Sequence, residues 1–127
     1  MNLLLDTHSM LWLFDDDDRL SKNAKEIITD PENRIFISIA SFWEIAIKMS
    51  LSKLVLDIPF EKLFDECEKL DFNILNISKR HLLFLKTLPF VHRDPFDRLI
   101  VCQAIIENCT LVSADRAFLE YNIKTIK

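Results

Sequence analysis

Short apolar runs alternate with helical segments along the whole chain, and this alternation is the feature that most constrains the fold. β-Branched and aromatic residues cluster in five runs, which predict strands at 2–5, 34–39, 73–77, 110–113 and 122–126. Apolar periodicity and capping residues predict helices between them, at 8–14, 22–29, 41–54, 60–70, from Ser78 onward, 99–106 and 116–120. We therefore expect an α/β sandwich with a mostly parallel central sheet of about five strands flanked by helices.

The composition favours one globular domain and excludes two classes of nucleotide site. Half of the 127 residues are hydrophobic, and no linker or repeat divides them, so residues 1–127 are expected to form a single domain. The chain has no glycine, which excludes the glycine-rich P-loop and the dinucleotide-binding loop. Asparagine is expected to replace glycine where the backbone needs positive φ, at Asn73, Asn108 and Asn122.

The sequence predicts a cytoplasmic protein with reduced cysteines. No apolar stretch approaches the ~20 residues needed to cross a membrane, and the first apolar run meets Asp6 too early for a signal peptide. Cys67, Cys102 and Cys109 form no CxxC pair, and their odd number argues against a disulfide framework. The net charge of -4 counts against a protein that holds nucleic acid mainly by bulk electrostatics.

Four acidic residues are predicted where strands end or where the next helix begins. Asp6 ends the first strand, Glu44 follows the second, Asp97 begins the apolar helix, and Asp115 follows the strand at 110–113. The carboxyl ends of parallel strands meet at one edge of a sheet, so these carboxylates are expected to converge there. A hard divalent cation would relieve their repulsion, and Mg²⁺ or Mn²⁺ suits oxygen ligands better than Zn²⁺.

Each acid also has a structural interpretation as part of a helix cap. Ser41 and Glu44 have the spacing of a capping box, and Asp94 has the position of an N-cap before Pro95, with Asp97 at N3. Asp6 and Asp115 are suited to cap the helices that follow them. For any one acid alone, capping is the favoured interpretation, but the coincidence of four at strand ends favours a shared site.

Four motifs resemble the PIN-domain ribonucleases in order and spacing, and most closely the VapC-type toxins of bacterial toxin–antitoxin pairs. The motifs are LLLDTHSMLWLF at residues 3–14, SIASFWEIAIKMSLSKL at 38–54, HRDPFDRLIVCQA at 92–104 and LVSADRAF at 111–118. The resemblance covers essentially the whole chain. It implies a PIN-like three-layer sandwich and a metal-dependent ribonuclease whose products carry a 5′-phosphate and a 3′-hydroxyl.

The resemblance implies that the family's acidic cluster falls on Asp6, Glu44, Asp97 and Asp115, which would bind Mg²⁺, with Mn²⁺ as an alternative. Asp97 is preferred to Asp94 because it leads directly into the apolar helix, and Asp94 is expected to support the site. Two positions depart from the family pattern: Ser52 replaces a common glycine, and Ser113 replaces a usual threonine while retaining a hydroxyl group.

Neighbouring residues are expected to support this cluster or the core. Thr7 is placed to orient a water on the metal, and Arg98 and Lys48 are placed either to reach RNA phosphates or to serve the structure. Lys48 in particular follows Glu44 at the i, i+4 spacing of an ordinary helix pair. His8 is expected to be packed or hydrogen-bonded, Trp12 and Trp43 are expected in the core, and the run 15–18 is expected to be a solvated connector.

The resemblance also implies two protein partners, a second copy of the chain and a VapB-type antitoxin, and an RNA substrate without membrane attachment. Two other functions remain open. The first is a different Mg²⁺-dependent phosphotransfer enzyme, such as a haloacid-dehalogenase phosphatase, although that class needs an aspartate where this chain has His8. The second is a non-catalytic α/β interaction module in which all four acids are caps.

Overall fold

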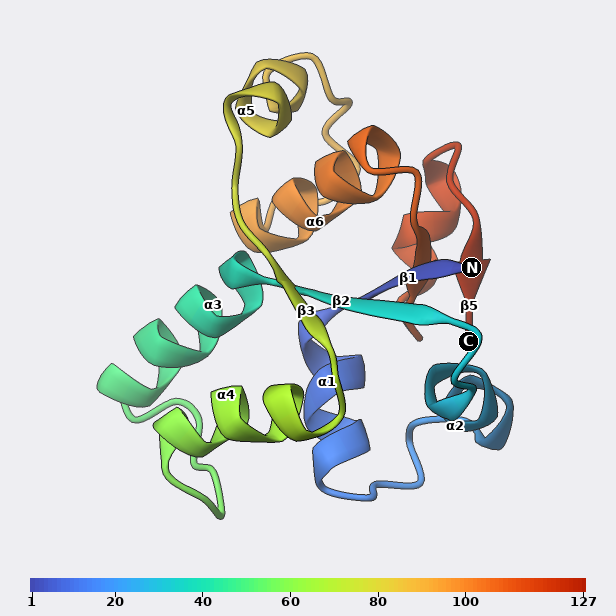
Figure 1. Cartoon of the computed structure of the whole chain (residues 1–127). Coiled ribbons are helices and arrows are strands. Elements are labelled where there is room, and N and C mark those ends of the chain that lie inside the picture. The colour runs from blue at the N-terminus through green and yellow to red at the C-terminus, as the bar shows by residue number, and fades with distance from the viewer.

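The computed structural model describes all residues, 1–127, as five strands and seven helices in alternation (Figure 1). None of the helices combines the length and the apolar character required to cross a membrane. The elements are β1 (Asn2–Leu5), α1 (Thr7–Phe14), α2 (Lys22–Thr29), β2 (Arg34–Ser38), α3 (Ile39–Ser50), α4 (Phe60–Lys69), β3 (Asn73–Leu75), α5 (Lys79–Leu85), α6 (Pro95–Ile106), β4 (Thr110–Val112), the 3₁₀-helix η1 (Arg116–Glu120) and β5 (Thr125–Ile126).

All five strands are parallel, in the order β3-β2-β1-β4-β5, which confirms the predicted fold class. The first strand lies at the centre, where Leu5 pairs with Ile37 of β2 on one side and with Val112 of β4 on the other. Every strand therefore enters at the same edge of the sheet and leaves at the opposite edge.

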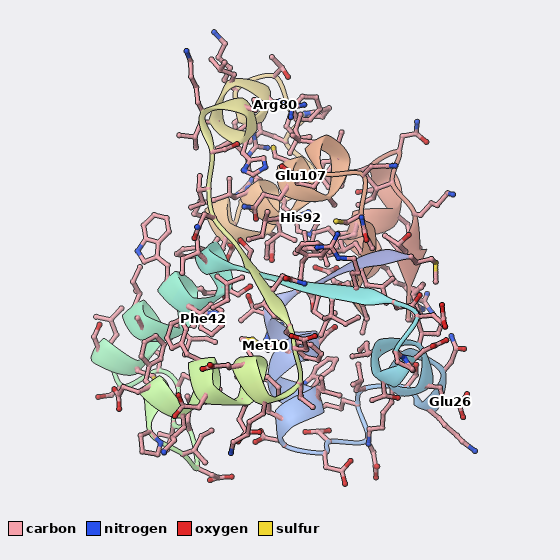
Figure 2. The ribbon with its side chains drawn as sticks, in the orientation of Figure 1. Met10, Glu26, Phe42, Arg80, His92 and Glu107 are labelled. Carbon is pink, nitrogen blue, oxygen red and sulfur yellow. The ribbon has the colours of Figure 1, made fainter.

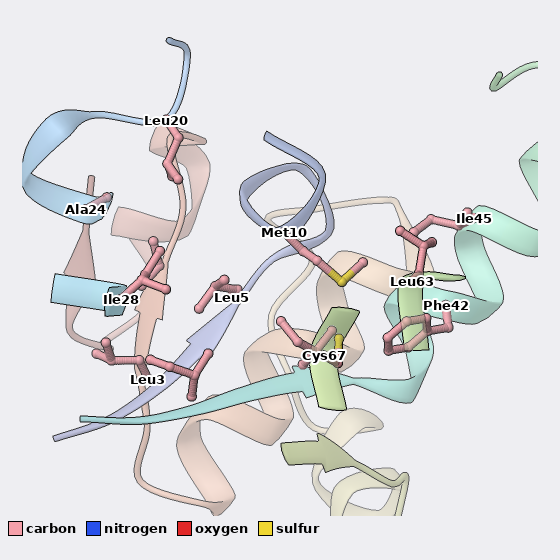
Figure 3. Packing of buried hydrophobic residues seen from close by; sticks show 13 residues of the cluster. Leu3, Leu5, Met10, Leu20, Ala24, Ile28, Phe42, Ile45, Leu63 and Cys67 are labelled. Carbon is pink, nitrogen blue, oxygen red and sulfur yellow. The ribbon is translucent and has the colours of Figure 1, made fainter. Parts of the chain in front are cut away.

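The side chains of β1 alternate between two hydrophobic layers. Leu3 and Leu5 contact a cluster that includes Met10 of α1, Phe42 of α3 and Leu63 of α4 (Figure 3). Leu4 points to the other face, where α6, β4 and η1 supply the second cluster. This alternation explains the run of three buried leucines, since a central parallel strand is covered on both faces.

Short polar side chains begin most of the helices, as the sequence predicts. Asp6, Ser21, Ser78, Asp94 and Asp115 each accept a hydrogen bond from a backbone N–H in the first turn of the following helix. These bonds satisfy donors that the helix itself leaves free.

The predicted N-cap of α3 is wrong by three residues. Ser38, rather than Ser41, is the N-cap, because its hydroxyl accepts the N–H of Ala40 at 3.0 Å. The capping box of Ser41 and Glu44 therefore does not exist, and both residues lie inside the helix with their side chains buried. The helix also ends at Ser50, before the predicted limit at residue 54.

Four residues other than glycine have positive φ: Asp16, Ser52, Asp71 and Asn108. Asn108 is predicted correctly, but Asn73 lies in β3 and Asn122 does not have positive φ. Ser52, with φ of 57°, adopts the left-handed conformation just after α3. This conformation explains why a glycine is suited to that position.

Replacing Ser52→Gly should stabilise the protein by about 0.5–1 kcal/mol, because glycine adopts positive φ without a steric penalty. Chemical denaturation would measure the change. Ser50→Gly is the matched control: its backbone is helical, so it should destabilise by up to about 1 kcal/mol. A loss of stability in Ser52→Gly would contradict the assignment of strain at this turn.

Candidate functional site

The predicted acids meet at the edge of the sheet where β1, β2 and β4 end. Asp6 directly follows β1, Glu44 lies in α3, Asp97 lies in the first turn of α6, and Asp115 follows β4. The first turns of α3 and α6 lie side by side (Figure 1), and the rings of Trp43 and Phe96 are in contact there.

Asp6 combines the capping role with membership of the site. Its carboxylate is buried, with Oδ1 accepting the N–H of Ser9 at 2.8 Å and Oδ2 accepting the hydroxyl of Ser113 at 2.5 Å. The Ser113 oxygen also accepts the N–H of Asp115 at 3.0 Å. Ser113 therefore links two of the four acids, which fits the hydroxyl expected at this position.

Glu44 is held by side chains from two helices. Its carboxylate is buried, Oε1 accepts the hydroxyl of Thr7 at 2.8 Å, and Oε2 accepts from Nζ of Lys48 at 2.5 Å. Thr7 also lies 2.9 Å from Oγ of Ser41, so its hydroxyl is committed to protein groups. The hydrogen bond that Lys48 donates to Glu44 is the main cause that raises the pKa of Lys48, helped by the charges of nearby Asp94 and Asp97.

Asp97 is the acid whose charge the protein compensates least. Asp94 caps α6, since its Oδ1 accepts the N–H groups of Phe96 at 2.8 Å and of Asp97 at 3.1 Å. No side chain or backbone group donates to the Asp97 carboxylate itself. Burial raises the pKa of Asp97 to about 7, and the charges of Asp94, Glu44 and Asp6 add to the effect, while His92 opposes it.

Asp115 lies at the exposed rim of the site and contacts a histidine. Its Oδ2 is 3.1 Å from Nε2 of His92, and its Oδ1 accepts the N–H of Ala117 at 2.9 Å. Partial burial disfavours the charged form, but the bonds from Ala117 and His92 outweigh it and lower the pKa of Asp115. Ligand atoms of His92, Asp97 and Asp115 lie within 4.8 Å of one another.

His92 is the residue of this site that the sequence analysis missed. It stands two positions before Asp94 in the motif HRDPFDRLI, so its presence in a motif with two aspartates was a usable signal. Its contacts were not readable, because Asp115 is 23 residues away along the chain.

The donor set fits a hard divalent cation. The available ligands are carboxylate oxygens, with one imidazole nitrogen nearby, and the Asp97 carboxylate accepts no hydrogen bond and forms no ion pair within the protein. Mg²⁺ and Mn²⁺ accept such oxygen-rich sets, and an ion among these groups would remove the repulsion that raises the Asp97 pKa.

Arg98 serves the structure, which is one of the two roles expected for it. Its side chain is buried, and its guanidinium donates to the carbonyls of Pro89 at 3.0 Å, Leu88 at 3.2 Å and Leu85 at 3.3 Å. The guanidinium also lies over the ring of Phe90, 4.0 Å from its centroid. These contacts bind the loop between α5 and α6 to the helix that carries Asp97.

One aromatic prediction is wrong. Trp43 is 54% exposed rather than buried, with its ring edge-on to Phe96 at 5.0 Å between centroids. His8 is exposed, and its ring lies beside that of Trp12 at 5.7 Å between centroids. Trp12 itself is half-buried against the core cluster.

Comparison with known families identifies one match. The sequence profile of the PIN domain matches residues 3–124, which is nearly the whole chain. Comparison with curated protein sequences gives no significant match.

Solved structures of similar fold include three from toxin–antitoxin systems. A chain of VapBC2 from Rickettsia felis, bound to a DNA fragment from the promoter, has a TM-score of 0.70 at 21% identity and covers 99% of this chain and 98% of its own. VapBC-1 from nontypeable Haemophilus influenzae has a TM-score of 0.66 at 18% identity, and the match covers 100% of this chain and 98% of that chain. A toxin–antitoxin complex from Klebsiella pneumoniae has a TM-score of 0.66 at 20% identity, and the match covers 98% of this chain and 96% of that chain. At these identities the likeness establishes the fold.

The pKa of Asp97 predicts how its replacement changes stability with pH in the absence of metal. The folded protein keeps a proton on Asp97 up to about pH 7, whereas an unfolded chain releases it near the ordinary aspartate pKa of 3.8. The contribution of this group to stability therefore falls as pH rises from about 4 to about 7. Asp97→Asn should consequently stabilise the metal-free protein at pH 8 by on the order of 1 kcal/mol, after allowance for solvent screening, and much less at pH 4.

Denaturation in EDTA at the two pH values would measure this difference. Asp57→Asn, at an exposed position away from the site, should show no such dependence. Equal stability of Asp97→Asn and the wild type at pH 8 would mean that Asp97 is not under electrostatic strain.

Proposed function

This chain belongs to the PIN domain family, and on that premise we propose that it is a metal-dependent endoribonuclease and the toxin of a VapC-type toxin–antitoxin pair. The observation that carries the proposal is the meeting of Asp6, Glu44, Asp97 and Asp115 at one edge of the sheet, with the Asp97 charge left uncompensated. A charge that the protein itself does not neutralise is expected where a cation binds.

Asp97 and Asp115, with Asp6 and Glu44 behind them, would hold Mg²⁺, or Mn²⁺ in its place. When bound, the cation would neutralise charge on the scissile phosphate and lower the pKa of a water molecule. The other groups keep the carboxylates in position: Ser113 holds Asp6, and Thr7 and Lys48 hold Glu44. Asp94 sets the first turn of α6, so the Asp97 side chain projects from a rigid element.

Two other arginines replace Arg98 as candidates to bind RNA phosphates. Arg93 is adjacent to His92 and Arg116 is adjacent to Asp115, and both are exposed with no ion pair to any acid of the chain. A few such contacts are compatible with a net charge of -4, because the metal provides the remaining attraction for the phosphate.

The partner proposed for this chain is a VapB-type antitoxin. One structure of similar fold is described as a toxin–antitoxin complex, and two others are described as VapBC structures. The antitoxin would inhibit the enzyme by binding near the four acids, where a basic side chain would be attracted to the cluster.

A second copy of the chain is the other partner that we propose. Trp43, Ile47 and Leu51 form an exposed apolar stripe along α3 at i, i+4 and i+8. A ridge of this spacing packs against the same ridge of a second helix, and a two-fold axis would cover both at once.

The two rival functions explain less of the site. A haloacid-dehalogenase phosphatase needs an aspartate at position 8, where this chain has an exposed histidine. A non-catalytic module explains the capping bonds of Asp6, Asp94 and Asp115 but leaves two acids without an account. Glu44 caps no helix, and Asp97 is half-buried among like charges without a hydrogen-bond donor.

The nuclease proposal predicts metal-dependent cleavage that requires Asp97. Purified protein should cut a mixed RNA pool in Mg²⁺, should not cut in excess EDTA, and should lose at least about 100-fold in rate on Asp97→Asn, because an acid ligand is removed. Mapping of the ends should give a 5′-phosphate and a 3′-hydroxyl.

Asp57→Asn is the control for this experiment, since it makes the same chemical change on the exposed surface. It should cut at the wild-type rate. Folded Asp97→Asn that cuts as fast as Asp57→Asn would contradict the assignment of the site, and cleavage that persists in EDTA would contradict the metal dependence.

The dimer proposal predicts that a charge in the α3 stripe separates the two copies. Light scattering after size exclusion should give twice the chain mass for the wild type and the single chain mass for Leu51→Glu. Leu119→Glu, at an exposed position on η1, should remain dimeric. A monomeric wild type at micromolar concentration would refute the proposal.

A further inference from the structure

We infer that His92 is a positioning residue that donates a hydrogen bond to Asp115, that Tyr121 sets the orientation of its ring, and that neither side chain binds the metal. This inference rests on the proposed function, since it concerns the same site. It assigns roles to two residues outside the four acids.

The ring of His92 is held in one place by aromatic neighbours. The residue is 8% exposed and lies in the interior on the α6 side of the sheet (Figure 2). Its ring is stacked on Tyr121 with an angle of 3° between planes and lies against Phe118 at 4.4 Å between centroids. Both neighbours are buried, so the ring has little freedom to turn away from Asp115.

The hydrogen bonds around Tyr121 are compatible with a ring proton on Nε2 of His92. The backbone N–H of His92 donates to the Tyr121 oxygen at 3.2 Å, and the same oxygen lies 3.4 Å from Nδ1 of His92. The phenol has one proton, and no other acceptor is bonded to it. That proton is available to Nδ1, and its donation there would leave the lone pair on Nδ1 and the ring proton on Nε2.

The proton on Nε2 faces the carboxylate. Nε2 lies 3.1 Å from Oδ2 of Asp115, whose side chain is 46% exposed and accepts a second hydrogen bond from Ala117 at Oδ1. A bare nitrogen at this distance would place its lone pair against those of the carboxylate. Donation from Nε2 is therefore the arrangement that satisfies both groups.

The two bonds fix the plane of the Asp115 carboxylate without using all of its lone pairs. Each oxygen accepts one hydrogen bond, and each keeps a free lone pair for a cation shared with Asp97. Removal of a partner that orients a metal ligand typically weakens metal binding by about 10- to 100-fold. Removal of a residue that binds the metal directly would weaken metal binding more than this, and a side chain that restores only the hydrogen bond to Asp115 would not rescue it.

The test measures Mn²⁺ affinity of the purified full-length protein by electron paramagnetic resonance, without RNA. His92→Ala should weaken Mn²⁺ binding by at least about 10-fold. His92→Gln should have a Mn²⁺ affinity within about 3-fold of the wild type, because the amide N–H of glutamine reaches toward the position of Nε2. Tyr121→Phe, which removes only the hydroxyl, should weaken binding by a few fold and keep the protein folded.

His81→Gln is the matched control, because His81 is also buried and its Nε2 also faces a carboxylate, that of Glu107 at 3.0 Å. Glu107 lies at the C-terminal end of α6, the opposite end from Asp97. It should change thermal stability but not Mn²⁺ affinity. A His92→Gln variant as weak as His92→Ala would overturn the inference, as would wild-type affinity in both His92 variants.

Electron spin-echo modulation of bound Mn²⁺ would separate positioning from ligation directly. We expect no coupling to a coordinated imidazole nitrogen; such a coupling, lost in His92→Gln, would make His92 a ligand and overturn the inference. Absence of Mn²⁺ binding in the wild type would also overturn it. Failure to cut RNA with these binding results intact would refute the ribonuclease proposal and leave the role of His92 standing.

Discussion

Parallel pairing of all five strands is the constraint on which the rest of the molecule depends. It places the carboxyl ends of β1, β2 and β4 at one edge of the sheet. Residues that are far apart in the sequence therefore meet there. The hydrogen bond from Ser113 to Asp6 joins the ends of two paired strands and is possible only in this register. The acidic cluster is thus a product of strand direction.

Capping and site formation use the same carboxylates. Asp6 and Asp115 each give one oxygen to the start of a helix and present the other to the site, and Asp94 shapes the turn from which Asp97 projects. Since a helix start attracts negative charge, the junctions of a parallel sheet lower the cost of gathering carboxylates in one place. The structural interpretation of these acids and the functional one are therefore compatible.

The sequence was sufficient where a signal is local. The strands, the parallel sheet, the caps Asp6, Asp94 and Asp115, and the placement of the four acids followed from periodicity, spacing and resemblance. It was insufficient where two local choices were equal, as between Ser38 and Ser41 as the cap of α3. It also failed where tertiary contacts decide: Arg98 is occupied by distant carbonyls, Trp43 remains uncovered, and His92 meets partners 23 and 29 residues away.

The buried guanidinium of Arg98 has a consequence for how the site comes into being. It binds three carbonyls of the segment that leads to His92, and it is next to Asp97 in the same helix. A buried charge keeps these bonds only when the surrounding core is complete, because unpaired it would be strongly unfavourable. Folding of the second hydrophobic layer and assembly of the acidic edge are therefore expected to be coupled, because Asp97 projects from the helix that Arg98 connects to this segment.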